Sequence, residues 1–171
     1  MTNPAPLVSG VDFVHLGTKD FEAAVQFYGT VLGLPCTSRY GEHPGAEFET
    51  GNLTLQVMES EAFGLEFHQA PNPIALHVDD VEAARAELES QGVAFRADTI
   101  DSGVCHMAFF EDPDGNALML HHRYAPRPSR LAGQILLGGR SLPHPQRYQS
   151  RDHRDQEDLA EECLDRGQRL R

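Results

Sequence analysis

The chain has 171 residues, with 14 basic and 26 acidic side chains and a formal net charge of −12. Residues 125–171 hold nine Arg and seven acidic residues, so residues 1–124 hold 5 basic and 19 acidic residues, a net charge of −14. A segment this acidic is a poor binder of phosphate backbones, which argues against nucleic acid as a partner. No basic, apolar leader opens the chain, and no apolar run reaches the ~20 residues of a membrane span, so we expect a cytoplasmic protein without a membrane partner.

The first predicted elements are a strand and a helix. Residues 11–17 form an apolar run of strand length, and Asp20 is suited to cap the helix that follows. The helix is predicted to end at Gly33, and Pro35 prevents its return. Its apolar stripe consists of Phe21, Ala24, Val25, Tyr28 and Leu32. Three strands are predicted next, at residues 36–40, 46–50 and 53–59, the last two forming a hairpin around Gly51-Asn52.

The same order recurs 60 residues later. Asp20-Phe21-Glu22-Ala23-Ala24 matches Asp80-Val81-Glu82-Ala83-Ala84 at this offset. The second copy is predicted to have a strand at 73–78, a helix from Asp80 to Gly92, a strand at 93–97 and a hairpin at 104–121. Because a single βαβββ unit cannot bury a sheet face alone, we predict an α+β fold in which two such modules, at about 11–60 and 73–122, pack as a pair.

The last hairpin contains the most distinctive turn of the chain. In Asp112-Pro113-Asp114-Gly115-Asn116, Pro113 presets φ and Gly115 can adopt the left-handed conformation that closes the turn. Together with the repeat and the helix end Phe27-Tyr28-Gly29-Thr30-Val31-Leu32-Gly33-Leu34, this turn resembles the vicinal oxygen chelate superfamily. That superfamily includes glyoxalase I, extradiol dioxygenases, fosfomycin-resistance enzymes and bleomycin-resistance proteins. The resemblance covers about residues 11–122 and implies a cup-shaped mixed sheet (the glyoxalase/bleomycin resistance/dioxygenase fold), a small-molecule ligand and a homodimer.

We therefore divide the chain into an N-terminal arm at 1–10, the domain at 11–124 and a tail at 125–171. The tail begins with a stretch rich in proline and arginine, which is typical of a linker. Residues 155–166 favour one short helix between Asp155 and Gly167. Whether this helix docks on the domain or frays is left open, because its apolar stripe is thin.

The metal-dependent members of the superfamily hold an ion with four inward residues, typically His on the first strand of each module and Glu on the last. Spacing from the helix-opening Asp residues and from the turn Gly, with strand alternation, maps these positions to Phe13, Gln56, Pro73 and Met119. None supplies the usual ligand, so we expect no standard metal site and do not favour a divalent metal as cofactor. These four residues are instead predicted to contact the substrate, together with Met58 and His106.

Three histidines share strand faces with these positions. His15 shares the face of Phe13, His77 that of Pro73, and His121 that of Met119, because side chains two or four residues apart on a strand point the same way. We predict that the three histidines are catalytic, either as a metal-free general base or as a displaced metal site. The alternative is that they are unrelated histidines at the rim of a pocket.

Adjacent Cys105 and His106 do not form a nucleophile–base pair, because neighbouring residues on a strand point to opposite faces. Both faces of this strand are apolar, so alternation leaves open which residue faces the pocket. For Cys105, a role as a small buried residue is favoured over a role as nucleophile. Asp101 and Ser102, just before this strand, are candidates for the edge of the pocket.

The favoured function is a small-molecule enzyme of unassigned reaction, with histidines carrying the chemistry. The alternative is a metal-independent protein that sequesters a ligand, as bleomycin-resistance proteins do, and the missing ligand set favours it. The acidic domain favours a cationic ligand, although solubility alone also explains such a charge. A third interpretation is a regulatory or interaction module whose tail meets a partner.

Overall fold

The computed structural model describes residues 7–127. The arm up to residue 6 and the tail from residue 128, including the short helix expected at 155–166, lie outside the described residues. Within the described part, no helix is both long and apolar enough to cross a membrane.

Each half of the described segment forms one four-stranded mixed sheet with a helix between its first two strands. In the first sheet the strand order is β1-β4-β3-β2, with β1 parallel to β4, and in the second it is β5-β8-β7-β6, with β5 parallel to β8. This arrangement confirms the predicted pair of βαβββ modules. The elements are β1 (Phe13–Thr18), α1 (Phe21–Val25), η1 (Gln26–Val31), β2 (Cys36–Arg39), β3 (Gly45–Glu49), β4 (Thr54–Glu59), η2 (Glu61–Phe63), β5 (Ile74–His77), α2 (Val81–Ser90), β6 (Ile100–Asp101), β7 (Cys105–Glu111) and β8 (Ala117–Arg123).

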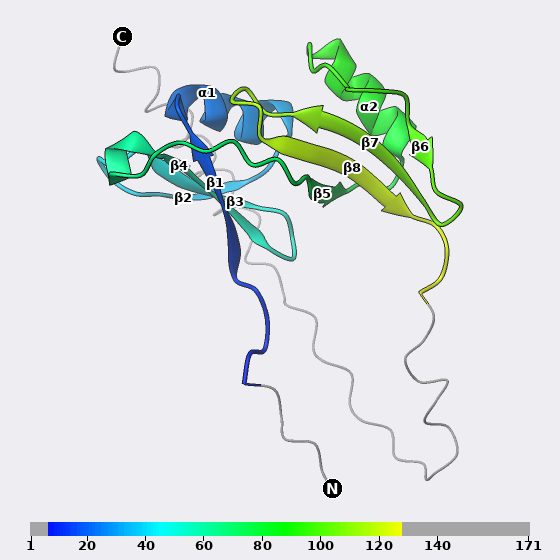
Figure 1. Ribbon diagram of the computed structural model, residues 1–171, viewed down its shortest axis with the longest axis horizontal. Helices are drawn as coiled ribbons and strands as arrows, with labels where there is room; N and C mark the ends of the chain where they lie inside the picture. The colour runs from blue at the N-terminus through cyan, green and yellow to red at the C-terminus, as the bar shows by residue number, and fades with distance from the viewer. Residues whose placement is uncertain (1–6, 128–171) are drawn as a thin grey trace, which may run out of the picture.

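The two helices begin as the sequence predicts. The carboxylate of Asp20 accepts a hydrogen bond from the backbone N–H of Ala23 at 3.0 Å, and that of Asp80 from Ala83 at 3.1 Å. Both are N-caps that satisfy a backbone donor left free in the first helical turn. Figure 1 shows α1 over the first sheet and α2 over the second.

Each sheet has one face covered by its helix and one face turned away from it. The covered faces share a single core that spans both modules. Its strand residues include Leu16, Ala46, Phe48, Leu55, Val57, Ala108, Phe110, Leu118 and Leu120, all of them buried. Because strand side chains alternate, the residues between these point the other way, and we call the two uncovered faces the open faces.

One predicted strand is wrong. Residues 93–97 do not form a strand; this segment touches β7 at a single bridge, between Phe95 and Phe110. Regular pairing starts only where Ile100 meets Met107. From Phe95 to Ile100 the segment advances by five residues, whereas β7 advances by three between their partners. The two surplus residues of the segment therefore leave the sheet. The apolar pattern at 93–97 reflects packing of Phe95 against the Phe110 ring, at 5.2 Å between ring centroids.

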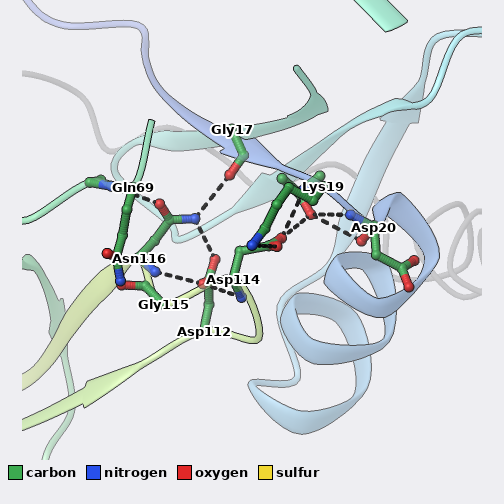
Figure 2. Close-up of polar contacts among 10 residues, drawn as sticks. Gly17, Lys19, Asp20, Gln69, Asp112, Asp114, Gly115 and Asn116 are labelled. Carbon is green, nitrogen blue, oxygen red and sulfur yellow. Dashed lines mark hydrogen bonds and ion pairs between the residues drawn. The ribbon is translucent and has the colours of Figure 1, made fainter. Parts of the chain in front are cut away.

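The turn between β7 and β8 joins the two modules (Figure 2). Asn116 donates to the carbonyl oxygen of Gly17 at 2.9 Å, and its own side-chain oxygen accepts from the N–H of Ala70 at 2.9 Å. The carboxylate of Asp114 accepts hydrogen bonds from the hydroxyl of Thr18 and the N–H of Lys19. The turn that carries the family resemblance is therefore a connection between module two and the end of β1.

Asp112 is the centre of this connection. Its side chain is buried and accepts hydrogen bonds from the hydroxyl of Tyr28 at 2.8 Å, the N–H of Asp114 at 3.0 Å, and both the N–H and the side-chain amide of Asn116 at 2.8 Å. Burial and the Asp112 carboxylate raise the pKa of Tyr28, which stays protonated and donates. Gly115 closes the turn with a φ of 84°, a conformation that favours glycine.

Candidate functional site

The open face of the first sheet contains two of the predicted site residues side by side. In the strand register, Gln56 of β4 lies between His15 of β1 and Glu47 of β3. Met58 is two residues further along β4 and pairs with Gly45. Phe13 lies at the start of β1 and is 53% exposed. Thus Phe13, His15, Gln56 and Met58 share one face, as strand alternation predicts.

Gln56 is part of a hydrogen-bonded network that sequence reasoning missed. Its side-chain nitrogen lies 2.6 Å from the hydroxyl oxygen of Tyr40, and this hydroxyl donates to Glu47 Oε1 at 2.7 Å. Burial and the hydrogen bond to Glu47 raise the pKa of Tyr40, so its hydroxyl keeps its proton at neutral pH. Glu47 could have been found as the strand partner of Gln56, whereas nothing in the sequence indicates that Tyr40, beyond the end of β2, reaches back over the sheet.

The charges on this face are acidic. Glu49 lies two residues from Glu47 on β3, and its carboxylate accepts from the hydroxyl of Thr54 at 2.7 Å. Arg39 is the one Lys or Arg in β1 to β4, and it turns to the helix side. There it pairs with Glu22 at 3.4 Å and lies over the Phe21 ring at 5.2 Å.

The open face of the second sheet has an apolar patch next to a pair of histidines. Met119 of β8 pairs with Ala75 of β5 and with Phe109 of β7. The next position along, His121, pairs with His77 on one side and Met107 on the other. The predicted residue Pro73 precedes β5 and is exposed. The apolar residues on this face are Ala75, Ile100, Met107, Phe109 and Met119.

The three predicted catalytic histidines lie at open-face positions of the two sheets, His15 on the first and the register partners His77 and His121 on the second. Across residues 7–127, no group of three or more His, Cys, Asp or Glu side chains is placed to hold a metal ion. The ring of His77 stacks instead on that of His122, with 5.9 Å between centroids, and its Nε2 lies 3.8 Å from Asp79. His122 also contacts the carbonyl oxygen of Val78 through Nδ1 at 3.0 Å. The pair of His77 and His122 is a contact that alternation did not predict, because the two residues differ in strand parity.

His106 lies on the other side of its sheet from Met107 and Phe109, and its predicted contact with the substrate stays a prediction. His106 pairs with His122 and alternates with the buried residues Ala108 and Phe110, so it belongs to the covered side of its sheet. Its ring lies 5.0 Å from that of Tyr124.

Cys105 has the parity of the open face but is itself buried, as predicted. Its sulfur lies 3.1 Å from the hydroxyl oxygen of Ser102. It is thus packed at the end of β7 rather than presented to a ligand. The neighbouring Asp101 carboxylate accepts from the hydroxyl of Tyr124 at 2.7 Å and from the N–H of Gly103 at 2.8 Å, and these two bonds lower the pKa of Asp101.

The residues at the family's metal positions do not fit a divalent ion. Phe13 and Pro73 offer no side-chain donor atom, and Met119 offers a thioether among apolar neighbours. Gln56 carries its amide nitrogen toward Tyr40 rather than a carboxylate toward a metal. These four residues therefore do not provide a site for metal-assisted chemistry.

Comparisons with known proteins agree with this fold. The family model described as Glyoxalase/Bleomycin resistance protein/Dioxygenase superfamily matches residues 10–120. No curated protein matches the chain. Among solved structures, lactoylglutathione lyase from Agrobacterium tumefaciens is similar with a TM-score of 0.56 and 18% identity, covering 68% of this chain and 95% of that one.

Two further structures are similar to the same extent. TnmS3, an antibiotic binding protein from Streptomyces sp. CB03234, has a TM-score of 0.59 and 24% identity over 70% of this chain and 99% of its own. A glyoxalase/bleomycin resistance protein/dioxygenase from Nocardioides has a TM-score of 0.56 and 21% identity, covering 74% of this chain and 93% of its own. These likenesses show the fold, and the match of the family model covers well over half of the sequence. The chain belongs to the Glyoxalase/Bleomycin resistance protein/Dioxygenase superfamily.

Proposed function

We propose that this protein binds an amphipathic small molecule on its open faces without a metal ion. The observation that carries the proposal is the placement of methionine. Met58, Met107 and Met119 are the methionines of the described part, and all three lie on the open faces, partly exposed, while the core contains none. Methionine is flexible and polarisable, and it is over-represented on surfaces that bind varied ligands.

The two open faces complement different parts of such a ligand. The second sheet offers Phe109 with Met107 and Met119, an apolar surface suited to an aromatic ring. The first sheet offers the hydrogen-bonding groups of Gln56 and Glu47. The similar structure of TnmS3, an antibiotic binding protein, supports a binding role of this kind.

The test is a fluorescence titration of the full chain with acridine, a planar aromatic probe. We expect saturable binding that Met119→Gln weakens about tenfold, because a polar amide replaces an apolar contact. The control is Leu65→Gln, since Leu65 is 52% exposed and lies outside both sheets. Equal affinities for Met119→Gln and the unsubstituted protein, or no saturable binding, would contradict the proposal.

A second candidate function is a metal-free reaction that uses histidine as general acid or base. It is favoured by the positions of His15 beside Gln56 and of His121 beside Met107, both on open faces. For this function we expect His121→Ala and His77→Ala to weaken ligand binding or turnover while changing thermal stability little, since both side chains are at least partly exposed. Imidazole resonances followed by NMR over about pH 5–8, with and without acridine, provide the measurement. Histidine titrations that ignore the ligand would eliminate this candidate.

We also propose that the protein is a homodimer. Four apolar side chains lead into or lie on β1, which is an edge strand of its sheet: Leu7, Val8, Val11 and Phe13, exposed by 100%, 74%, 69% and 53%. Such a row on a strand edge is typical of an association surface. We expect sedimentation analysis to show a dimer that Phe13→Asp dissociates and Val104→Asp, at another exposed apolar site, does not. A monomer at all concentrations would refute this.

A further inference from the structure

The network around Tyr40 fixes the direction of each of its hydrogen bonds. The hydroxyl oxygen lies 2.7 Å from Glu47 Oε1 and 2.6 Å from the side-chain nitrogen of Gln56. An ionised carboxylate has no proton to donate, so the single hydroxyl proton of Tyr40 must point at Glu47. The hydroxyl oxygen can then only accept from Gln56, which must turn its NH₂ group, not its carbonyl, toward Tyr40. The orientation of the amide thus follows from the number of protons that the three groups can donate.

This leaves two acceptors without a protein partner. Gln56 Oε1 is directed away from Tyr40 and accepts no hydrogen bond within residues 7–127, and the same holds for Glu47 Oε2. We infer that Tyr40 and Glu47 lock Gln56 with its carbonyl oxygen toward the ligand, and that this part of the open face selects a cationic amine or amidine carried on an aromatic frame. The inference rests on the proposed binding function and names the class of ligand.

The surrounding charges favour the same class. Glu47 and Glu49 lie on this face, and Arg39, the one Lys or Arg of these four strands, is engaged with Glu22 on the other side. An N–H-rich cation can donate to Gln56 Oε1 and Glu47 Oε2 and offset the carboxylate charge at once. A carboxylate or phosphate ligand would meet two acceptors and the charges of Glu47 and Glu49, with His15 as the neighbouring group able to donate to it. Glu47 has no ion-pair partner within residues 7–127, so no salt bridge has to break on binding.

The backbone of β3 holds the network in place. The ring of Tyr40 lies directly over Gly45, and a β-carbon at residue 45 would collide with this ring. The backbone N–H of Tyr40 also donates to the carbonyl oxygen of Gly45 at 3.0 Å. Glycine at this position therefore allows Tyr40 to reach Glu47 and Gln56, and Gly45→Ala displaces Tyr40 without changing any of the three polar side chains.

The experiment compares two probes of nearly the same shape on the full chain. Acridine is neutral at pH 7.5, whereas 9-aminoacridine is a cation that donates N–H groups. We expect 9-aminoacridine to bind at least about tenfold more tightly than acridine, because it alone meets the free acceptors. If neither probe binds, both the proposed function and this inference fail. If both bind with equal affinity, the binding function stands and the inference is overturned.

Matched variants separate the locked amide from simple charge attraction. Glu47→Gln and Glu49→Gln remove the same charge from the same strand, but only Glu47 bonds to Tyr40. We expect Glu47→Gln and Gly45→Ala each to reduce the preference for 9-aminoacridine about tenfold, and Glu49→Gln to reduce it no more than about twofold. Acridine affinity should not change in any of them. Equal effects of the two Glu→Gln variants would show that the site recognises only the charge of the ligand. That result would overturn the inference that Tyr40 and Glu47 fix the orientation of Gln56.

Side-chain amide NMR gives a readout that does not depend on ligand. In ¹⁵N-labelled protein, we expect the Gln56 NH₂ signal to be shifted and slow to exchange, and Tyr40→Phe to return it to the position of an exposed Gln such as Gln26. A Gln56 signal that ignores Tyr40→Phe, in a variant whose melting temperature shows that it is folded, would contradict the assigned orientation.

Discussion

Replacing Asp112 by Ala is expected to lower the free energy of unfolding by about 3 kcal/mol and the melting temperature by roughly 10 °C or more. The carboxylate accepts hydrogen bonds from the buried groups of Tyr28 and Asn116, which would be left without a partner away from water. Unsatisfied buried polar groups cost far more than the net gain of a hydrogen bond. Differential scanning calorimetry of the two proteins provides the measurement.

Two variants make this result specific. Asp98→Ala removes an exposed Asp that has no hydrogen bond within residues 7–127 and should leave the melting temperature unchanged. Tyr28→Phe removes one of the donors to Asp112 and should cost about 1–2 kcal/mol. If Asp112→Ala were no more destabilised than Asp98→Ala, the turn would not be the connection between the modules that the structure shows.

The second large effect is expected in the core that the modules share. Phe110 is fully buried in the cluster that also contains Leu16 of module one, so Phe110→Ala should cost about 3–5 kcal/mol. Because the core is continuous, both modules should still unfold in one transition rather than two. Urea titrations followed by circular dichroism and by tyrosine fluorescence measure this, because the tyrosines include Tyr28 in module one and Tyr124 at the end of module two, and one transition requires the two signals to coincide.

The neighbouring residue is the natural control. Phe109 has the same side chain but points to the open face, where it pairs with Met119. We expect Phe109→Ala to cost much less stability than Phe110→Ala and to weaken acridine binding instead. The reverse order of stabilities would mean that the assignment of the two faces is inverted.

Much of the architecture was predictable because local chemistry and the repeat agree. Asp20 and Asp80 cap their helices through the same hydrogen bond, and the turn at Asp112 joins two strands as its residue types require. Alternation along β4 also predicted correctly that Leu55 is buried and that Gln56 is on the other face. These features depend on residues close together in the sequence.

The features that escaped prediction depend on contacts between distant residues. Tyr40 reaches Gln56 across the sheet only because Gly45 leaves room for its ring, and no local pattern encodes that approach. The side on which His106 lies was ambiguous because both faces of β7 are apolar, and only the pairing with β8 decides it. Strand parity predicted the faces on which His15, His77 and His121 lie, but it gives no distance between residues of different sheets, so their joint catalytic role stays a prediction.

The most direct test of the account is the response of the methionine methyl groups to a bound probe. Met58, Met107 and Met119 report on the two open faces, and the chain contains only 4 methionines, so methyl-labelled protein gives a simple NMR spectrum. Titration with 9-aminoacridine is predicted to shift the methyl resonances of all three methionines in proportion to the fraction of protein that has bound the probe. Saturable binding that leaves Met107 and Met119 unmoved would place the ligand elsewhere and contradict the account.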